Sequence, residues 1–267
     1  MAFQETQVFF QPERPPATAV WASRIAVFSA GVLLAGLFMH RLFSLPTPVA
    51  LNLVGLSIVG AVVAIILAVF AAWRIWQTGC QGTARLVLAV LMAVTLLVWP
   101  LAHLPKINAL PEINDVTTDL ENPPGFGTLA DTRAKDANSP DYQGERFAEL
   151  QREAYPDLQT LWVNRSGAEA YEIAQEALKR QGLQIVTAAP PGQTTDRPGI
   201  IEAYDRTLVL GFYDDVVVRV IGNSRSARID LRSASRYGRH DLGRNAKRIR
   251  RLLSEVNARL EATVPTQ

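Results

Sequence analysis

The chain opens with three long apolar runs and continues with shorter, mixed patterns. The runs extend from Ile25 to Met39, from Val49 to Trp73 and from Leu86 to Ala102, and none has a polar face. A surface helix of a soluble protein keeps one polar side, whereas a transmembrane helix needs about 20 predominantly apolar residues. We therefore predict three membrane-spanning helices within residues 21–104, after an N-terminal tail over residues 1–20.

Basic residues are distributed unequally about the predicted spans. On one side stand Arg14, Arg24, Arg74 and Arg85, and on the other stand Arg41 and Lys106. Cytoplasmic loops of membrane proteins carry the excess of Lys and Arg. We therefore expect a protein of the bacterial inner membrane with a cytoplasmic N-terminal tail and a soluble part in the periplasm.

Residues 105–160 predict an extended arm with one short helix. Asn122 to Phe126 combines turn-forming residues with two prolines, which cannot continue a helix. The short helix is expected from Gly144 to Glu153, where Tyr155-Pro156-Asp157 ends it. Two interpretations of the arm stay open: a solvated linker, or a segment whose Asn, Asp and Thr side chains dock on the following domain.

Helical and strand periods alternate over residues 161–262. Ser166 and Glu169 form a capping-box pattern, and the helix behind them is amphipathic up to Gly182. A second amphipathic helix is expected from Leu242 to Ala262. Between the helices, β-branched residues predict strands at Leu183–Ala188, Ile200–Tyr204, Thr207–Phe212, Val216–Ile221 and Ala227–Leu231.

Short polar turns join the expected strands, at Asp205-Arg206, at Asp214-Asp215 and at Gly222-Asn223. Connections this short allow only antiparallel neighbours. The fold class is therefore α+β, an antiparallel sheet of four or five strands with two helices packed on one face. A tail over residues 263–267 follows.

Charge divides the C-terminal part into two opposed halves. Residues 103–218 hold ten Lys/Arg and nineteen Asp/Glu, and residues 219–259 hold twelve and three. Opposite charges within one domain favour internal pairing. We expect a charge cluster in which the aspartates of the arm and the sheet neutralise arginines at the last helix, namely Asp115, Asp119, Asp214 and Asp215 with Arg232, Arg236 and Arg248.

The same basic stretch permits two other interpretations. Asp241 or Ser235 can cap the last helix, whose free N–H groups attract anions, and nearby arginines suit phosphate or carboxylate, as in a lipid headgroup. Alternatively, the exposed face of that helix docks an acidic protein partner. The candidate site residues are Asp115, Thr118, Asp119, Asp214, Asp215, Arg219, Arg232, Ser233, Ser235, Arg236, Gly238, Asp241, Asn245 and Arg248.

Signatures of catalysis are weak. Cys80 is the only cysteine, and His240 is the only histidine beyond the predicted spans and their ends. Neither a Gly-x-Ser-x-Gly elbow nor a glycine-rich phosphate loop occurs. We expect no catalytic residue, no metal and no cofactor. Nucleic acid is not expected as a partner, because Tyr237 is the only aromatic residue of the basic stretch.

An ordered series of motifs resembles the domain-of-unknown-function 1499 family over Leu110 to Leu260. The motifs are Ile113–Asp119, Asn122–Pro124, Tyr155–Asp157, Gly211–Arg219, Arg232–Gly238 and Asp241–Ile249. The resemblance implies a bacterial membrane protein with a few N-terminal spans, and it implies no activity. We expect a non-catalytic binding or assembly module of the cell envelope, anchored in the lipid bilayer, with its ligand and oligomeric state open.

Overall fold

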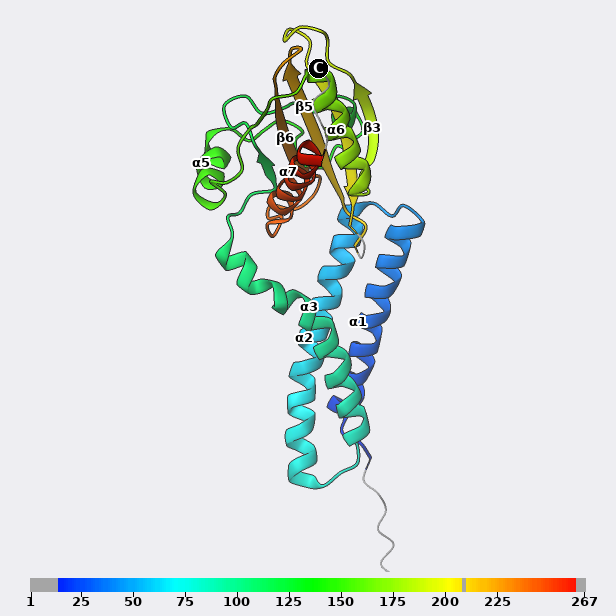
Figure 1. Ribbon diagram of the computed structural model, residues 1–267. Helices are drawn as coiled ribbons and strands as arrows, with labels where there is room; N and C mark the ends of the chain where they lie inside the picture. Colours follow the sequence, from blue (N-terminus) through cyan, green and yellow to red (C-terminus); the bar gives the residue numbers. More distant parts are fainter. Residues whose placement is uncertain (1–13, 208–209, 263–267) are drawn as a thin grey trace, which may run out of the picture. The chain divides into compact units, whose positions relative to one another are not determined.

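The computed structural model describes residues 14–207 and 210–262, which form two compact units, Met1–Ala102 and His103–Gln267 (Figure 1). Each unit has its own buried apolar cluster.

The N-terminal part of the chain forms three helices: α1 (Ala17–Leu42), α2 (Thr47–Thr78) and α3 (Thr83–Ala109). The first unit ends within α3, at Ala102. Each helix is long and apolar enough to span a membrane. Small residues such as Ala22, Ala61 and Ala64 are fully buried between the helices, which allows close approach. Large apolar side chains point outwards instead, an arrangement suited to a lipid environment. The predicted membrane spans are thus present as apolar helices.

A six-stranded antiparallel sheet organises the second unit. Its strands are β1 (Asp115–Thr117), β2 (Leu161–Val163), β3 (Gln184–Ala189), β4 (Gly199–Arg206), β5 (Tyr213–Gly222) and β6 (Ala227–Ser235). They run in the order β1-β6-β5-β4-β3, and β2 also pairs with β6. The α+β class is confirmed. The sheet gains two strands because the short segments β1 and β2 both pair with β6.

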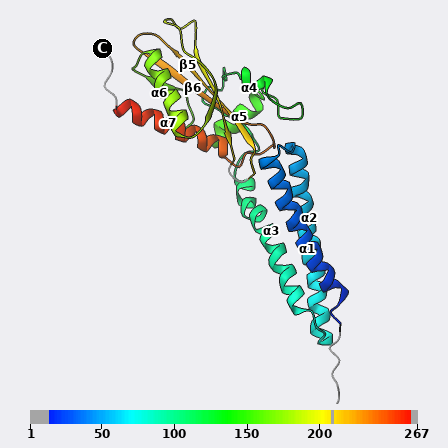
Figure 2. The same ribbon diagram turned by 90° about the vertical axis from the view of Figure 1, so that its right-hand side faces the viewer.

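Helices α6 (Gly167–Arg180) and α7 (Arg244–Ala262) pack on one face of the sheet (Figure 2). Ser166 accepts from the Glu169 N–H while Glu169 accepts from the Ser166 N–H, so the predicted capping box is present. The helices and strands β4, β5 and β6 enclose the apolar core, which includes Leu178, Ile201, Val218, Ile229 and Ile249.

The arm belongs to the domain and does not hang free. Helices α4 (Thr128–Asp131) and α5 (Glu145–Ala154) lie within it, and β1 pairs with Arg232 to Ala234. Gln151 of α5 accepts from the Thr117 N–H at 3.0 Å and donates to the Thr117 carbonyl at 2.5 Å. Docking is therefore correct, and the solvated linker is not.

Three local predictions in the sheet are wrong. Asp205-Arg206 and Asp214-Asp215 lie inside β4 and β5, paired with each other. The connection between these strands is formed by the predicted strand Thr207–Phe212, whose residues 208–209 lie outside the described residues. The Thr207 carbonyl accepts from Gly211, and its hydroxyl accepts from the Phe212 N–H at 2.9 Å. Gly211 has a φ of 73°, which closes the turn.

Candidate functional site

Strand alternation sends the two adjacent aspartates of β5 to opposite faces of the sheet, because neighbouring side chains point in opposite directions. Asp214 faces helix α7 and is bound by Arg248, whereas Asp215 faces the arm and is bound by Arg133. The pair therefore cannot work as two cooperating carboxylates. It builds two separate polar clusters instead.

On the arm side, Arg232 is the most completely enclosed cation of the predicted set, with 1% of its surface exposed. Its Nε donates to Asp115 Oδ1 at 3.0 Å and one terminal nitrogen donates to Oδ2 at 2.7 Å. The carbonyl oxygens of Pro124 and Pro140 accept from the same guanidinium at 3.0 and 2.7 Å. The Phe126 ring lies 4.6 Å from its central carbon. No face of this guanidinium is left for a ligand.

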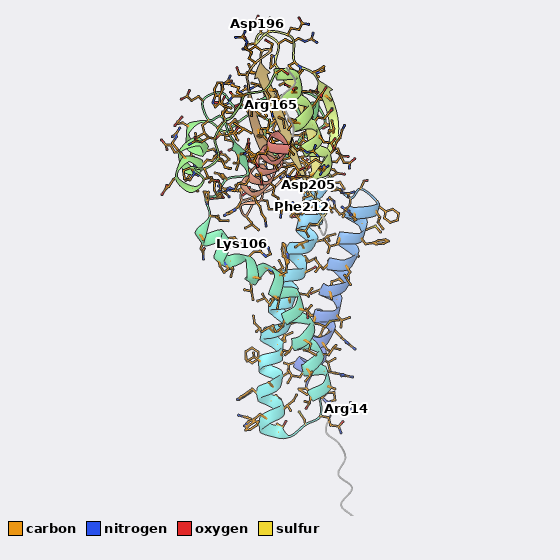
Figure 3. All side chains as sticks on the ribbon, in the orientation of Figure 1. Arg14, Lys106, Arg165, Asp196, Asp205 and Phe212 are labelled. Carbon is orange, nitrogen blue, oxygen red and sulfur yellow. The ribbon has the colours of Figure 1, made fainter. Side chains whose placement is uncertain are left out.

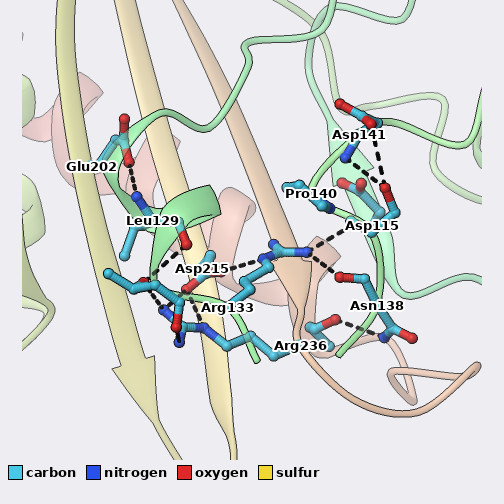
Figure 4. A network of polar contacts seen from close by, with 12 residues as sticks. Asp115, Leu129, Arg133, Asn138, Pro140, Asp141, Glu202, Asp215 and Arg236 are labelled. Carbon is cyan, nitrogen blue, oxygen red and sulfur yellow. Dashed lines mark hydrogen bonds and ion pairs between the residues drawn. The ribbon is translucent and has the colours of Figure 1, made fainter. Parts of the chain in front are cut away.

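A second arm-side cluster forms around Asp215, whose side chain is fully buried. Arg133 and Arg236 each donate to it from Nε at 2.9 Å (Figure 4). Nearby, Glu202 accepts from the N–H groups of Gly127 and Leu129 at 2.8 and 2.7 Å, at the start of α4. This face of the sheet therefore holds the arm by charge.

The third cluster surrounds Arg219. It donates to Asp119 and to Asp230, both at 2.8 Å, and Arg228 contacts the same two carboxylates at 3.3 Å. Next to them, the Thr118 hydroxyl accepts from the Leu231 N–H at 2.8 Å. These contacts fix the residues that follow β1.

On the helix side, Arg248 reaches from α7 to the ends of β4 and β5. It donates to Asp205 at 2.6 Å and to Asp214 at 2.7 Å. Its other terminal nitrogen donates to Ser233 and to Asn245, both at 2.9 Å. Asn245 also donates to the Ser235 hydroxyl at 3.1 Å, so the network is continuous.

The turn before α7 is closed by its own side chains. Asp241 accepts from the N–H groups of Gly243 and Asn245, both at 2.8 Å, and so neutralises the positive end of the helix. The Gly238 carbonyl accepts from the Asn138 amide at 2.9 Å. A carboxylate of the chain therefore already binds two N–H groups at this helix start, and an external anion would have to displace it.

His240 ties the same turn to the residue that follows helix α3. Its Nδ1 accepts from the Leu242 N–H at 2.9 Å, and its Nε2 lies 3.2 Å from the Leu110 carbonyl oxygen. Only the neutral ring with a hydrogen on Nε2 satisfies both contacts. Gly243 lies against Leu110 as well: a Cβ at Gly243 would stand 3.0 Å from the Leu110 side chain.

Outside these clusters, one flank of α7 forms a groove with a volume of ≈ 360 Å³, which we call the basic groove. It is lined by Gln181, Leu183, Asp205, Arg244, Lys247, Arg248 and Arg251. Lys247 and Arg251 are exposed, and neither forms an ion pair within residues 14–207 and 210–262. Arg244 is 45% exposed at its side chain and lies 3.3 Å from Asp214.

The family model described as "Protein of unknown function (DUF1499)" matches residues 115–256. That range covers every cluster described above. The chain belongs to this family. No curated protein and no solved structure matches the chain.

The buried carboxyls of the DUF1499 domain have shifted pKa values. Burial raises the pKa of Asp115, Asp215 and Asp241, although arginines or backbone N–H groups act against it. Burial lowers the pKa of Arg133. For Arg248, burial acts downwards but is outweighed by Asp214 and Asp205, which raise its pKa. All of these pKa shifts occur in side chains that form hydrogen bonds or ion pairs with other groups of the same domain.

Sequence reasoning missed several members of the DUF1499 clusters: Arg133, Glu202, Asp205 and Asp230. Glu202 stands between Ile201 and Ala203 in β4, and Asp230 stands between Ile229 and Leu231 in β6, all of them buried apolar neighbours. A charge in such a position signals a buried partner, since an unpaired buried charge is costly. Among the described residues, no group of three or more His, Cys, Asp or Glu side chains is arranged to hold a metal ion.

Proposed function

We propose that the protein is a membrane-anchored, non-catalytic binding module of the bacterial cell envelope. Its basic groove takes a ligand through a phosphate or carboxylate group. One observation carries the proposal: the groove has four cationic side chains and one anionic side chain, and Lys247 and Arg251 have no carboxylate partner within the described residues.

The groove suits an oxyanion better than the buried clusters do. Arg232 and Arg219 already donate to carboxylate and carbonyl oxygens of the chain. An entering ligand would have to displace these acceptors. Arg244 and Arg251 offer planar forks that match the oxygens of phosphate or carboxylate, and Lys247 adds a mobile point charge. Arg248, held by Asp205 and Asp214, forms a fixed wall.

The direct test is a calorimetric titration. The full chain is reconstituted in nanodiscs of neutral phosphatidylcholine and titrated with inorganic pyrophosphate. Arg251→Glu should weaken binding at least about tenfold, equivalent to about 1.4 kcal/mol.

Arg225→Glu is the matched control for charge. Arg225 is exposed in the turn after β5, whereas Asp205 pairs near the opposite end of that strand. The strand has ten residues, so the two positions are about 30 Å apart along the sheet. Equal effects of the two substitutions, or absence of pyrophosphate binding, would overturn the proposal.

For localisation, we propose the inner membrane with the DUF1499 domain in the periplasm. The basic residues about the apolar helices support this orientation. In a Cys80→Ser background, Gln81→Cys between α2 and α3 should resist an impermeant maleimide in intact cells. Asn257→Cys on α7 should react once the outer membrane is permeabilised. The reverse labelling pattern would refute the orientation.

A further inference from the structure

We propose that the occupant of the basic groove is the anionic headgroup of a phospholipid in the bilayer that holds the protein's own helices. This inference rests on the proposed function, since it names the source of the oxyanion. It makes the groove a contact that fixes the domain on its membrane.

The first support is the position of the groove within the domain. The turn before α7 is bonded to Leu110 through His240, and Gly243 lies against the Leu110 side chain. Leu110 directly follows helix α3, the third apolar helix. The first groove residue, Arg244, stands next to Gly243. The groove therefore begins at the end of the domain where the chain enters it from α3.

The second support is the form of the groove. Arg244, Lys247 and Arg251 follow one another at intervals of three and four positions, which places them along one flank of the helix. They are exposed and line an open groove rather than an enclosed cavity. A row of long basic side chains on a helix flank suits a layer of lipid phosphates. Each basic side chain adds electrostatic attraction to that layer.

Apolar residues lie at the same end of the sheet. Figure 3 shows Phe212 beside Asp205, which lines the groove, while Asp196 lies towards the opposite end of the domain. Leu210 and Phe212 belong to the turn between β4 and β5 and are partly exposed. A basic row beside apolar side chains is the combination expected at a membrane interface.

Tethering favours the bilayer over a free anion. A ligand on the same membrane acts at a high effective concentration when the linker is short. The five residues 110–114 between α3 and β1 span about 18 Å at most when fully extended. Even weak individual headgroup contacts are therefore sufficient for occupancy.

The experiment places a fluorophore beside the groove. Gln184→Cys in a Cys80→Ser background puts it on β3, next to the groove residue Leu183. The labelled full chain is reconstituted with a trace of lipid that carries a quencher on its headgroup. Replacing part of the phosphatidylcholine by phosphatidylglycerol should increase quenching at least twofold, and high salt should reverse the increase.

Variants decide what the increase means. Arg251→Glu should abolish the increase in quenching that phosphatidylglycerol causes, and Arg225→Glu should leave this increase unchanged. No response to phosphatidylglycerol, or equal loss in both variants, overturns the inference. If pyrophosphate still binds the wild type in neutral nanodiscs, the proposed function stands and the groove serves a soluble anion or an acidic protein. If pyrophosphate does not bind and quenching does not respond, both fail.

Discussion

The DUF1499 domain uses arginine in two opposite ways. Arg232 is almost fully buried and donates to one carboxylate and two carbonyl oxygens, whereas Arg251 is exposed on α7. The first type fixes geometry, because its hydrogen bonds are all made within the chain. The second type is available to a partner. A dense run of arginine therefore marks a binding surface only where the structure leaves some of them without carboxylates.

The largest effect is expected when one member of a buried pair is removed. Asp115→Ala leaves Arg232 enclosed without its carboxylate, and such losses cost about 3–5 kcal/mol of unfolding free energy. Pulse proteolysis of the full chain in urea would measure it. The double variant Asp115→Leu, Arg232→Met should recover most of the loss, since the charge is removed with its partner. A single substitution that costs less than about 1 kcal/mol would contradict the buried role.

Loss of the α7 cap should cost less. Asp241→Ala removes the acceptor for two N–H groups, and caps of this kind contribute about 1–2 kcal/mol. Asp241→Asn retains an acceptor without the charge. Because burial raises the folded-state pKa of Asp241, stability from its protonated form is present at low pH and is lost as pH rises through that pKa. The advantage of wild type over the Asn variant should therefore shrink as the pH rises above the ordinary pKa of aspartate, and an advantage that grows would refute the shift.

An exposed pair with good geometry should matter little. Arg250 donates to both oxygens of Asp157 at 2.6 and 2.7 Å, yet the two side chains are 43% and 52% exposed. Water and salt screen such pairs, which contribute about 0.2–1 kcal/mol. Arg250→Ala in the same urea assay should stay within this range. A loss as large as that of Asp115→Ala would erase the distinction between buried and exposed pairs.

The smallest effect on stability belongs to the groove. Arg251→Glu should change the unfolding free energy by no more than about 0.5 kcal/mol, because the side chain makes no ion pair within the described residues. The same variant should lose pyrophosphate binding. A marked loss of stability in urea would mean that Arg251 supports the fold rather than a ligand.

Elements that are set by local sequence patterns could be predicted from the sequence. The apolar runs and the helical period of α7 extend over many residues, and the capping box of α6 lies within four consecutive positions, so local physics decides all three. The opposed charges of the two halves also predicted that aspartates of the arm and sheet pair with arginines of the C-terminal stretch, without assigning individual pairs. Asp119 pairs with Arg219 and Arg228 instead of the arginines expected for it. Asp115 with Arg232 and Asp214 with Arg248 lie in direct contact.

What sequence could not provide is set by contacts between distant segments. β1 has three residues, all buried, so it shows no alternation to betray a strand. Asp214 and Asp215 read as a turn because aspartate usually marks one, and only their arginine partners make a strand interior acceptable. The groove was equally hidden. Which cations of α7 lack a carboxylate partner depends on where the fold places the side chains of Asp205 and Asp214. The order of residues along the chain does not reveal these positions.

Strand β1 also sets the order in which the domain can be completed. Asp115 and its partner Arg232 are 117 positions apart. At ribosomal speeds of about 5–20 residues per second, this separation corresponds to roughly 6–23 s. During that interval the apolar helices are already made, while Ile113 and Val116 have no sheet to cover them. A chain truncated before β6 would therefore carry complete helices and an uncovered arm, and it would be a natural target for chaperones and proteases.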